Sequence, residues 1–393
     1  MRVLLTFSYG VSLESWEQYG YLTRETSIYK KIAEDNNVNF KFLTYGTEND
    51  LRYNDIIGNT EVIPVGNLLK SKIPKYHFIK SLFLPQKFKD LFKNIDLIKS
   101  YQAYGSWIAC IAKILFKKKV IVRCGFGWLN YHILSYKKKG LKQYIKYLAK
   151  YVFIFLNELV AYKLADGIIS TNNQDVLFIR KCYRLNRKYK SGKIKQFFNS
   201  IDENIFKQLN LEKKDKSVLF VGRLSYDKNL FNLIKAFKGL DGFKLNIIGR
   251  GPEEFKLRQL AKSLNVTVNL LGIIPNANIP EYINQNQMFI LPSYSEGNPL
   301  ALLEAMSCEA ACIGSNVKGI NNVLKHGING YLCETNSESI KNAIIDLYNN
   351  NKLREEIGKN ARKFVLENCK LDSIADKEYC FYKDILKMRS ANK

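Results

Sequence analysis

Two carboxylates separated by seven residues are the most chemically suggestive side chains of this sequence. Glu296 lies in a Ser/Gly/Asn/Pro stretch that follows the apolar run 288–291, and Glu304 lies in the apolar run that comes next. We predict a short buried strand over 288–291 and a helix from Pro299 through Met306. A glutamate in the loop and one in the helix can then approach a single ligand from two sides, one at a sugar ring and one at a ribose. The spacing alone fits a helix cap followed by a solvated helix glutamate equally well.

The loop between this strand and this helix is also a candidate anion site. The backbone N–H groups of Gly297, Asn298 and Leu300 are expected to point at a phosphate, because the N-terminus of a helix presents unpaired N–H groups and the positive end of its dipole.

Two cations follow another predicted strand. The run 217–221 ends at Gly222 and is followed by Arg223 and, five residues later, Lys228. Arginine offers a planar fork for phosphate oxygens and lysine a mobile point charge, so the pair fits a diphosphate and the stabilisation of a charged leaving group. Taken singly, either cation fits a surface loop as well.

A glycine-rich turn, Gly249-Arg250-Gly251-Pro252, ends the next predicted strand. Glycines let the backbone approach a ligand closely, although such a turn also occurs without one.

Strand-like and helix-like runs alternate along the whole chain, which predicts α/β architecture with two doubly wound, parallel-sheet domains. We place the first domain at residues 1–195, the second at 196–372, and a C-terminal helix that packs back toward the first domain at 373–393. The expected strands are 3–7, 38–44, 56–57, 62–64, 97–100, 120–123, 167–170, 217–221, 243–248, 266–270, 288–291 and 311–315, and the expected helices are 21–35, 103–116, 138–164, 229–237, 254–264, 279–284, 300–306 and 374–386. Residues 187–193 are expected to form a surface loop, with a linker near residue 195. Ligands of such sheets bind beyond the carboxyl ends of the strands, where Gly222, Gly249 and Ser293 fall.

The net charge of +25 is concentrated in the first half of the chain, where residues 1–200 hold 34 Lys and Arg against 14 Asp and Glu. Segments 70–93 and 136–150 interleave lysines with bulky apolar residues, which is typical of contact with an anionic membrane surface. A transmembrane helix fits poorly, since Lys146, Lys150 and Glu158 interrupt the apolar stretch. Nucleic acid is not expected as a partner, because lysine dominates and no RRM, KH or helix-turn-helix pattern occurs. An ordinary solvated basic surface is the plain alternative.

The eight cysteines form no C-x-x-C pair and are expected to be reduced, and residues 1–7 are interpreted as a first strand and not as a signal peptide. These features predict a cytoplasmic protein, peripheral on the inner face of a membrane.

Taken in order, these motifs resemble the retaining glycosyltransferases of family 4. The resemblance covers residues 195–335 and is carried by Arg223 and Lys228, the turn 249–252, the E-x7-E pair, and further matches at 199–202, Gly319 and 327–330. It implies a GT-B fold, in which two Rossmann-like domains face each other and bind donor and acceptor. It also implies a nucleotide diphosphate sugar as donor substrate, no cofactor and no metal. The sequence agrees with that, since it lacks the D-x-D triplet with which other glycosyltransferases hold a cation on the diphosphate.

The resemblance also assigns roles to residues. Arg223 and Lys228 correspond to residues that bind the donor diphosphate, Glu304 to one that binds the ribose, and Glu296 to one that binds the donor sugar, beside Gly297 and Asn298. The donor site as a whole would comprise Gly222, Gly249, Arg250, Leu271, Ile274, Gly297, Asn298, Leu300 and Glu304.

The acceptor side departs from the family pattern. The loop after strand 120–123, where relatives carry a histidine, contains Arg123 and Gly125, and His132 follows it. The N-terminal Gly-Gly loop of relatives is replaced by residues 8–12, with Gly10 left to allow close approach. Asn322 stands where the family has a glutamate. We take Gly10, Arg123, Gly125 and His132 as acceptor-side candidates; a histidine beside an aromatic residue is more often structural.

The sequence thus predicts a retaining hexosyltransferase acting on a lipid-linked or membrane-surface glycan. Alternatives are a GT-B nucleotide-sugar epimerase or hydrolase, and a basic nucleic-acid- or membrane-binding protein without catalysis.

Overall fold

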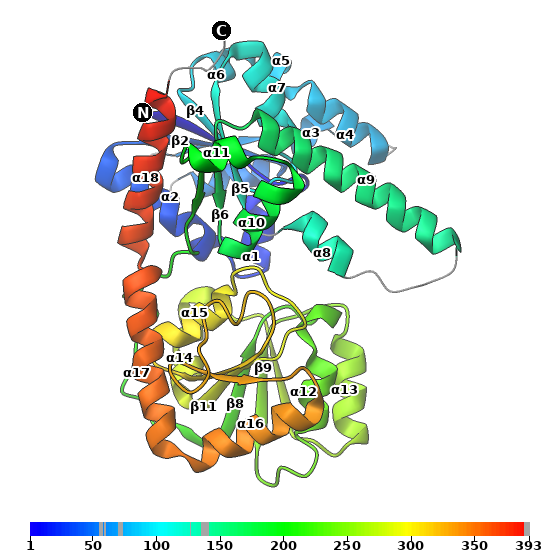
Figure 1. Cartoon of the computed structure of the whole chain (residues 1–393), viewed down its shortest axis with the longest axis vertical. Coiled ribbons are helices and arrows are strands. Elements are labelled where there is room, and N and C mark those ends of the chain that lie inside the picture. Colours follow the sequence, from blue (N-terminus) through cyan, green and yellow to red (C-terminus); the bar gives the residue numbers. More distant parts are fainter. Residues whose placement is uncertain (55–57, 59, 70–73, 126, 135–140, 389–393) are drawn as a thin grey trace. The chain divides into compact units, whose positions relative to one another are not determined.

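The structure is a computed structural model of the chain, and it describes residues 1–54, 58, 60–69, 74–125, 127–134 and 141–388. The chain divides into two compact units (Figure 1). The first comprises Met1–Phe198 together with Ile374–Lys393, and the second comprises Asn199–Ser373. Both are α/β units built on parallel sheets.

The first unit contains, among its described residues, a seven-stranded sheet in the order β3-β2-β1-β4-β5-β6-β7. All six strand pairs are parallel. The elements are β1 (Arg2–Thr6), α1 (Leu13–Gln18), α2 (Leu22–Asn36), β2 (Asn39–Thr44), η1 (Glu48–Tyr53), β3 (Glu61–Pro64), α3 (Gly66–Leu69), α4 (Pro74–Leu82), α5 (Leu84–Lys87), α6 (Lys89–Lys93), β4 (Leu97–Ser100), α7 (Trp107–Phe116), β5 (Lys119–Cys124), α8 (Trp128–Leu134), α9 (Leu141–Leu164), β6 (Gly167–Ser170), α10 (Asn173–Cys182), α11 (Asn186–Lys190), β7 (Ile194–Gln196) and α18 (Leu371–Lys387).

Two apolar cores cover the two faces of this sheet. Successive residues of β1 pack into opposite cores: Leu4 lies in one, and Val3 and Leu5 lie in the other. This alternation follows from the two-residue period of a β-strand. Residues of α7 and α9 build the first core, and residues of α2 and α18 build the second. Both faces are therefore buried, which explains why the central residues of strands such as β1 and β5 are apolar.

The second unit, residues 199–373, holds a six-stranded sheet in the order β10-β9-β8-β11-β12-β13. Its strand pairs are parallel as well. Its elements are β8 (Lys214–Val221), η2 (Tyr226–Lys228), α12 (Leu230–Ala236), β9 (Lys244–Ile248), α13 (Glu254–Ser263), β10 (Val268–Gly272), η3 (Asn276–Asn278), α14 (Ile279–Gln285), β11 (Asn286–Leu291), α15 (Leu300–Ser307), β12 (Ala311–Ser315), β13 (Tyr331–Cys333), α16 (Ser337–Asn349) and α17 (Asn351–Asn368).

Most predicted elements lie where the sequence placed them, and two expectations need correction. The loop expected at 187–193 is in part a helix, α11, whose Lys188 Nζ donates to the Tyr162 and Lys163 carbonyls at the end of α9, 2.8 and 2.7 Å away. The linker expected near residue 195 is the edge strand β7, which pairs with β6, so the first unit continues to Phe198. The weak strand expected at Ile56 and Ile57 lies outside the described residues.

Candidate functional site

The second unit brings its candidate residues together where the strand order reverses. From β8 the chain adds β9 and β10 on one side and then crosses to β11 on the other, so the loops after β8 and β11 lie next to each other at the carboxyl edge. Such a reversal is where ligands of doubly wound sheets bind. The Tyr294 N–H donates to the Asp227 carbonyl over 2.8 Å, which joins the two loops directly.

Lys228 and Glu296 form the centre of this site. The Lys228 Nζ lies 2.6 Å from Glu296 Oε1, and the Ser293 hydroxyl donates to the same oxygen over 2.7 Å. Both side chains are largely shielded from water, with 19% and 12% of their surface exposed. Because a shielded, charge-assisted pair fixes both partners, the loops hold a cation and a carboxylate in a defined relative position.

Glycines at the ends of β8, β9 and β10 keep the neighbouring loops close. Gly249 has a φ of +134°, and a Cβ on it would lie 1.9 Å from the Gly222 carbonyl oxygen. The Gly249 N–H donates to the Gly272 carbonyl over 2.7 Å. Only glycine fits this position, because the backbone at the ends of β8 and β9 approaches too closely for a side chain.

Arg223 and Arg250 follow β8 and β9, and both are exposed. The side chain of Arg250 extends toward the end of β10, since a Cβ on Gly272 would lie 3.9 Å from Arg250 Nε. Leu271 is an exposed residue of β10, and Ile274, two residues after this strand, is half-buried. The two exposed guanidinium groups are thus available to solvent-borne anions at the carboxyl edge of this sheet.

Glu304 lies on α15 and is almost completely buried, and Asn276 Nδ2 donates to its Oε1 over 2.9 Å. Asn276 belongs to η3, the short helix after β10, and sequence reasoning missed it. The helix α15 starts at Leu300, with Pro299 as its N-cap.

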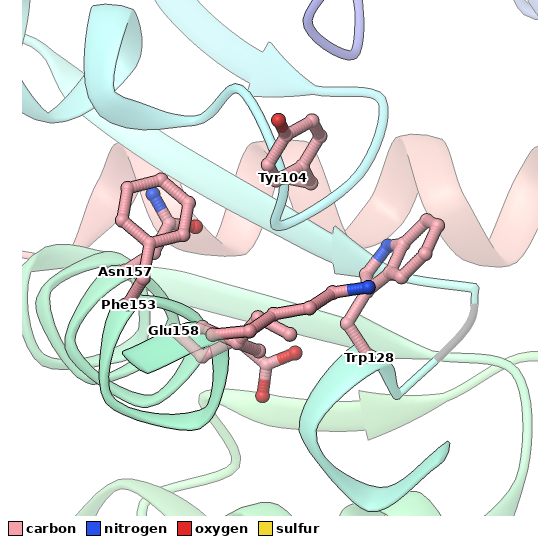
Figure 2. Close-up of a pocket in the computed structure, with 7 residues that line it drawn as sticks. Tyr104, Trp128, Phe153, Asn157 and Glu158 are labelled. Atoms are coloured by element: carbon pink, nitrogen blue, oxygen red, sulfur yellow. The ribbon is translucent and has the colours of Figure 1, made fainter. Parts of the chain in front are cut away.

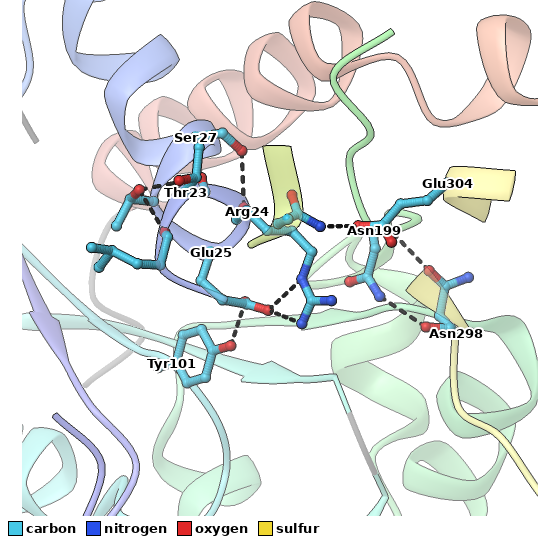
Figure 3. A network of polar contacts seen from close by, with 11 residues as sticks. Thr23, Arg24, Glu25, Ser27, Tyr101, Asn199, Asn298 and Glu304 are labelled. Atoms are coloured by element: carbon cyan, nitrogen blue, oxygen red, sulfur yellow. Dashed lines mark hydrogen bonds and ion pairs between the residues drawn. The ribbon is translucent and has the colours of Figure 1, made fainter. Parts of the chain in front are cut away.

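Asn298 was expected to line the donor sugar, and the structure gives it a different contact. Its Oδ1 accepts from the Asn199 N–H over 2.9 Å, and its carbonyl accepts from Asn199 Nδ2 over 3.0 Å (Figure 3). Asn298 therefore links the loop between β11 and α15 to Asn199, the first residue of the second unit. Gly297 lies beside it in a loop that packs on Gly319, where a Cβ would come within 2.2 Å of the Glu296 carbonyl oxygen.

The acceptor-side candidates of the first unit fall into three places. Gly10 follows β1, has a φ of +78° and would have nothing within 4 Å of a Cβ. Arg123, in β5, lies over the Tyr101 ring, and the Gly125 N–H donates to Gln102 Oε1 over 2.9 Å. His132 is not part of this group: it lies on α8, its ring stacks on Tyr147 of α9, and its Nε2 is 3.1 Å from the Tyr147 carbonyl oxygen. These contacts favour the structural interpretation of His132.

A cluster near Arg123 was not foreseen. The Tyr101 hydroxyl donates to Glu25 Oε2 over 2.5 Å, and Arg24 pairs with Glu25 Oε1 at 2.9 Å (Figure 3). Burial alone would raise the pKa of the Glu25 carboxyl, but Arg24, the Tyr101 hydroxyl and Arg123 together hold that pKa below its usual value. Glu25 lies inside an ordinary helix-forming run, so nothing in its sequence context signals this role.

Ser8 lies at the end of β1, beside the point where the strand order of the first sheet reverses between β1 and β4. It is buried, and its hydroxyl has no hydrogen-bond partner among the described residues. A buried polar atom without a partner is uncommon, so Ser8 is a candidate contact for a ligand. Its position directly after a strand is a signal that the sequence did contain.

No helix within the described residues is long and apolar enough to cross a membrane. Within the same residues, no group of three or more His, Cys, Asp or Glu side chains is placed to hold a metal ion.

Comparison with known proteins defines the class. A crystal structure of Anabaena HepE in complex with UDP and glucose superposes with a TM-score of 0.75 over 98% of this chain and all of that chain, at 16% identity. Sucrose-phosphate synthase from Thermosynechococcus elongatus gives a TM-score of 0.78 over 98% of this chain and 99% of that one, at 17% identity. The two Rossmann-like units therefore form a GT-B fold.

The second unit can be assigned more narrowly. Residues 201–364 match the family model "Glycosyl transferases group 1". The N-acetyl-alpha-D-glucosaminyl L-malate synthase of Bacillus anthracis is 27% identical over 245 residues, which are 59% of this chain and less than two thirds, 64%, of that protein. The UDP-Gal:alpha-D-GlcNAc-diphosphoundecaprenol alpha-1,3-galactosyltransferase of Escherichia coli is 28% identical over 81% of this chain and 80% of its own length.

Proposed function

We propose that this protein is a retaining glycosyltransferase of family 4 that moves a hexose from a nucleotide diphosphate sugar to a lipid-linked or membrane-surface glycan. The observation that carries the proposal is the Lys228–Glu296 pair, 2.6 Å apart at the strand-order reversal of a glycosyltransferase group 1 domain. UDP-sugars are the first donors to test, because HepE was crystallised with UDP and glucose and the E. coli relative is named for UDP-Gal.

In the proposed reaction the donor diphosphate lies against Lys228 and Arg223, the ribose against Glu304 and the sugar against Glu296. The bond between the anomeric carbon and the diphosphate oxygen breaks while the acceptor hydroxyl oxygen bonds to the same face of that carbon. The acceptor proton passes to the departing phosphate oxygen. Lysine and arginine stabilise the negative charge that grows on this oxygen, so the reaction needs neither a protein nucleophile nor a metal ion.

The acceptor is proposed to bind the first unit. Gly10 leaves open space after β1, and the buried Ser8 hydroxyl lies nearby in sequence. Arg123 lies near the end of β5, and Gly125 directly follows this strand. The E. coli relative acts, by its name, on a sugar linked to diphosphoundecaprenol, which supports a lipid-linked acceptor. The basic first half of the chain supports a peripheral position on the inner, anionic face of a membrane.

The central test combines donor screening with site variants. Nucleotide sugars are first screened by the thermal stabilisation that a bound ligand gives, and the best donor is then assayed with lipid-linked glycans. Glu296→Gln and Lys228→Ala are expected to abolish transfer and to leave the unfolding temperature of the unliganded chain nearly unchanged. Lys256→Ala is the matched control, because Lys256 is an exposed lysine of the same unit, on α13, and pairs with Glu253 at the start of that helix.

Three results would contradict parts of the proposal. Full transfer activity in Glu296→Gln or Lys228→Ala would contradict the assignment of these residues to the donor site. A product with inverted anomeric configuration, seen by NMR, would contradict the retaining mechanism. Loss of activity in the presence of a chelator, with recovery after addition of Mg²⁺, would contradict a metal-independent reaction. Hydrolysis or isomerisation of the donor without any acceptor would identify a hydrolase or epimerase instead.

A further inference from the structure

A pocket of about 350 Å³ lies within the first unit (Figure 2). The rings of Tyr104 and Trp128 lie on one side of it, and side chains of α9 lie on the other. Its volume is within the range of roughly 300–1,000 Å³ that small-molecule sites occupy. The lining residues are Tyr104, Trp128, Lys150, Phe153, Ile154, Asn157 and Glu158.

The walls of this pocket are mainly aromatic and apolar. The one carboxyl group among them, that of Glu158, is already bonded within the protein: Oε2 accepts from the Tyr183 hydroxyl over 2.6 Å, and Oε1 accepts from the Leu129 N–H over 3.3 Å. Glu158 therefore needs no polar ligand, and the pocket fits an apolar group.

The pocket opens beside an unusual surface of α9. Along this helix a stripe of apolar side chains at spacings of three and four residues is about half exposed, and we call it the α9 stripe: Ile145, Leu148, Val152, Leu156 and Val160. Phe153, which is 44% exposed, lies next to this stripe and also lines the pocket. An apolar chain that lies on the stripe can therefore enter the pocket past Phe153 without crossing a polar surface.

The exposed charged side chains next to this surface are cations. Lys146 and Lys150 lie on α9 itself, and both are exposed. Lys150 also lines the pocket, so a cation stands next to the apolar cavity. An apolar cavity with an adjoining cation is complementary to a molecule with a hydrocarbon chain and an anionic head.

We propose that the pocket holds part of the hydrocarbon chain of an anionic lipid, whose phosphate is paired with Lys150. Phe153, Tyr104 and Trp128 enclose the chain, and the rest of it follows the α9 stripe into the bilayer. The inference deepens the proposed function and rests on it in one respect: the lipid would be the carrier of the acceptor glycan.

Dodecyl phosphate below its micelle concentration is a suitable probe, because it supplies one chain and one phosphate without a bilayer. Binding is followed by tryptophan emission, since Trp128 is 39% exposed while the other two tryptophans, Trp16 and Trp107, are buried. The wild-type chain is expected to bind dodecyl phosphate more tightly than the uncharged dodecyl maltoside. Phe153→Ser and Lys150→Ala are each expected to weaken binding by about tenfold, the factor that 1.4 kcal/mol represents.

Leu177→Ser is the matched control, because Leu177 is 43% exposed on α10 of the same unit, lies outside the α9 stripe and does not line the pocket. It should leave dodecyl phosphate binding unchanged. The proposal is overturned by absence of binding, by equal affinity for the two detergents, or by binding that Phe153→Ser does not affect. A dimer that Phe153→Ser dissociates, seen by sedimentation, would also overturn it and assign the surface to a second copy of the chain.

The thermal stabilisation of the same samples by a nucleotide sugar is measured in parallel. It shows whether the lipid pocket and the donor site fail together or separately. A chain that binds the donor but not dodecyl phosphate lacks only the lipid pocket. One that binds dodecyl phosphate but no nucleotide sugar retains a lipid site and is not a glycosyltransferase.

Discussion

The two glutamates of the E-x7-E pair have different surroundings in the structure, which the sequence alone does not show. Glu296 and Glu304 are both glutamates near one loop, yet Glu296 is paired with a cation, whereas Glu304 is almost fully buried and accepts from the neutral amide of Asn276. The two carboxylates therefore differ in charge environment and can bind different parts of one ligand.

Glu304→Gln tests this difference. The substitution keeps the shape of the side chain and removes its charge, so a contact with ribose hydroxyls would weaken by about 1–3 kcal/mol, the range for hydrogen bonds to charged groups. The expected result is a rise in donor KM of about tenfold or more, with a smaller change in kcat. Glu281→Gln, an exposed change on α14, should alter neither constant. An unchanged donor KM in Glu304→Gln would contradict the ribose assignment.

Glu158 gives the first unit a predicted pH dependence. Burial raises the pKa of its carboxyl to about 7, although the Tyr183 hydroxyl and the backbone N–H of Leu129 oppose the rise. Since this pKa is higher in the folded chain than in the unfolded one, the folded chain binds more protons between the two values. The contribution of Glu158 to stability is therefore present below about pH 4.3 and is lost as the pH rises through about 7.

Glu158→Gln, which resembles the protonated side chain, should abolish this dependence. Between about pH 5 and pH 8 the wild-type chain is expected to lose up to about 3 kcal/mol of stability relative to the variant, at 1.36 kcal/mol per pKa unit. Parallel unfolding curves of the two proteins at each pH measure the difference. A difference that does not change with pH would show that Glu158 is already ionised at about pH 5.

At the level of helices, strands and loops, the glycines at the strand ends of the second unit are the positions where a side chain is least tolerated. Gly249→Ala would place a Cβ 1.9 Å from a backbone oxygen at a φ that disfavours other residues. We expect it to destabilise the second unit by more than about 3 kcal/mol, since both strain and overpacking contribute. In Gly327→Ala the φ of +71° is strained but nothing lies within 4 Å, so a loss of about 1 kcal/mol is expected. Urea unfolding of both variants makes the comparison, and equal losses would show that close approach is unimportant.

The sequence predicted most of the helices and strands of the structure. The predicted ranges of β4, β6 and β12 match the structure because a strand buried on both faces consists mainly of apolar and small residues, although β4 also contains the buried Lys99. The short helix α11 was missed because its stability comes from Lys188, which reaches the carbonyls at the end of α9. Strand β7 was assigned to a linker, since an edge strand of three residues has almost no pattern of its own.

The candidate site was predictable to a similar extent. Lys228 and Glu296 each follow a buried strand, and parallel strands bring their carboxyl ends to one edge, so their proximity could be inferred. Asn276, the Glu25 cluster and the pocket around Trp128 could not, because these contacts join elements whose packing only the structure defines.

For the molecule as a whole, the C-terminal helix matters most. From Ile374 on, α18 belongs to the first unit, and Phe381, Tyr382 and Ile385 are buried in one of its two cores. Lys99 of β4 is fully buried and pairs with Glu378 of α18, next to the Tyr29 and Tyr382 rings (α18 is red in Figure 1). Burial lowers the pKa of the Lys99 ammonium, although the Glu378 carboxylate offsets part of this effect.

Removing one member of this buried pair leaves the other charge without a partner. Lys99→Met is expected to destabilise the first unit by about 3–5 kcal/mol, and the double variant Lys99→Met/Glu378→Gln to recover a large part of the loss. The exposed change Lys377→Met on the same helix should have almost no effect. Thermal unfolding of the three proteins gives the comparison, and a double variant no more stable than Lys99→Met would show that packing, and not the unpaired charge, causes the loss.

The path of the chain through the two units has a consequence for its synthesis. The chain leaves the first unit after Phe198, builds all of the second, and supplies part of a core of the first only after Ser373. On the ribosome, the unit that is encoded second is therefore the first whose residues are all available. Until α18 emerges, the aromatic and aliphatic side chains that it covers in the first unit stay open to water and to chaperones.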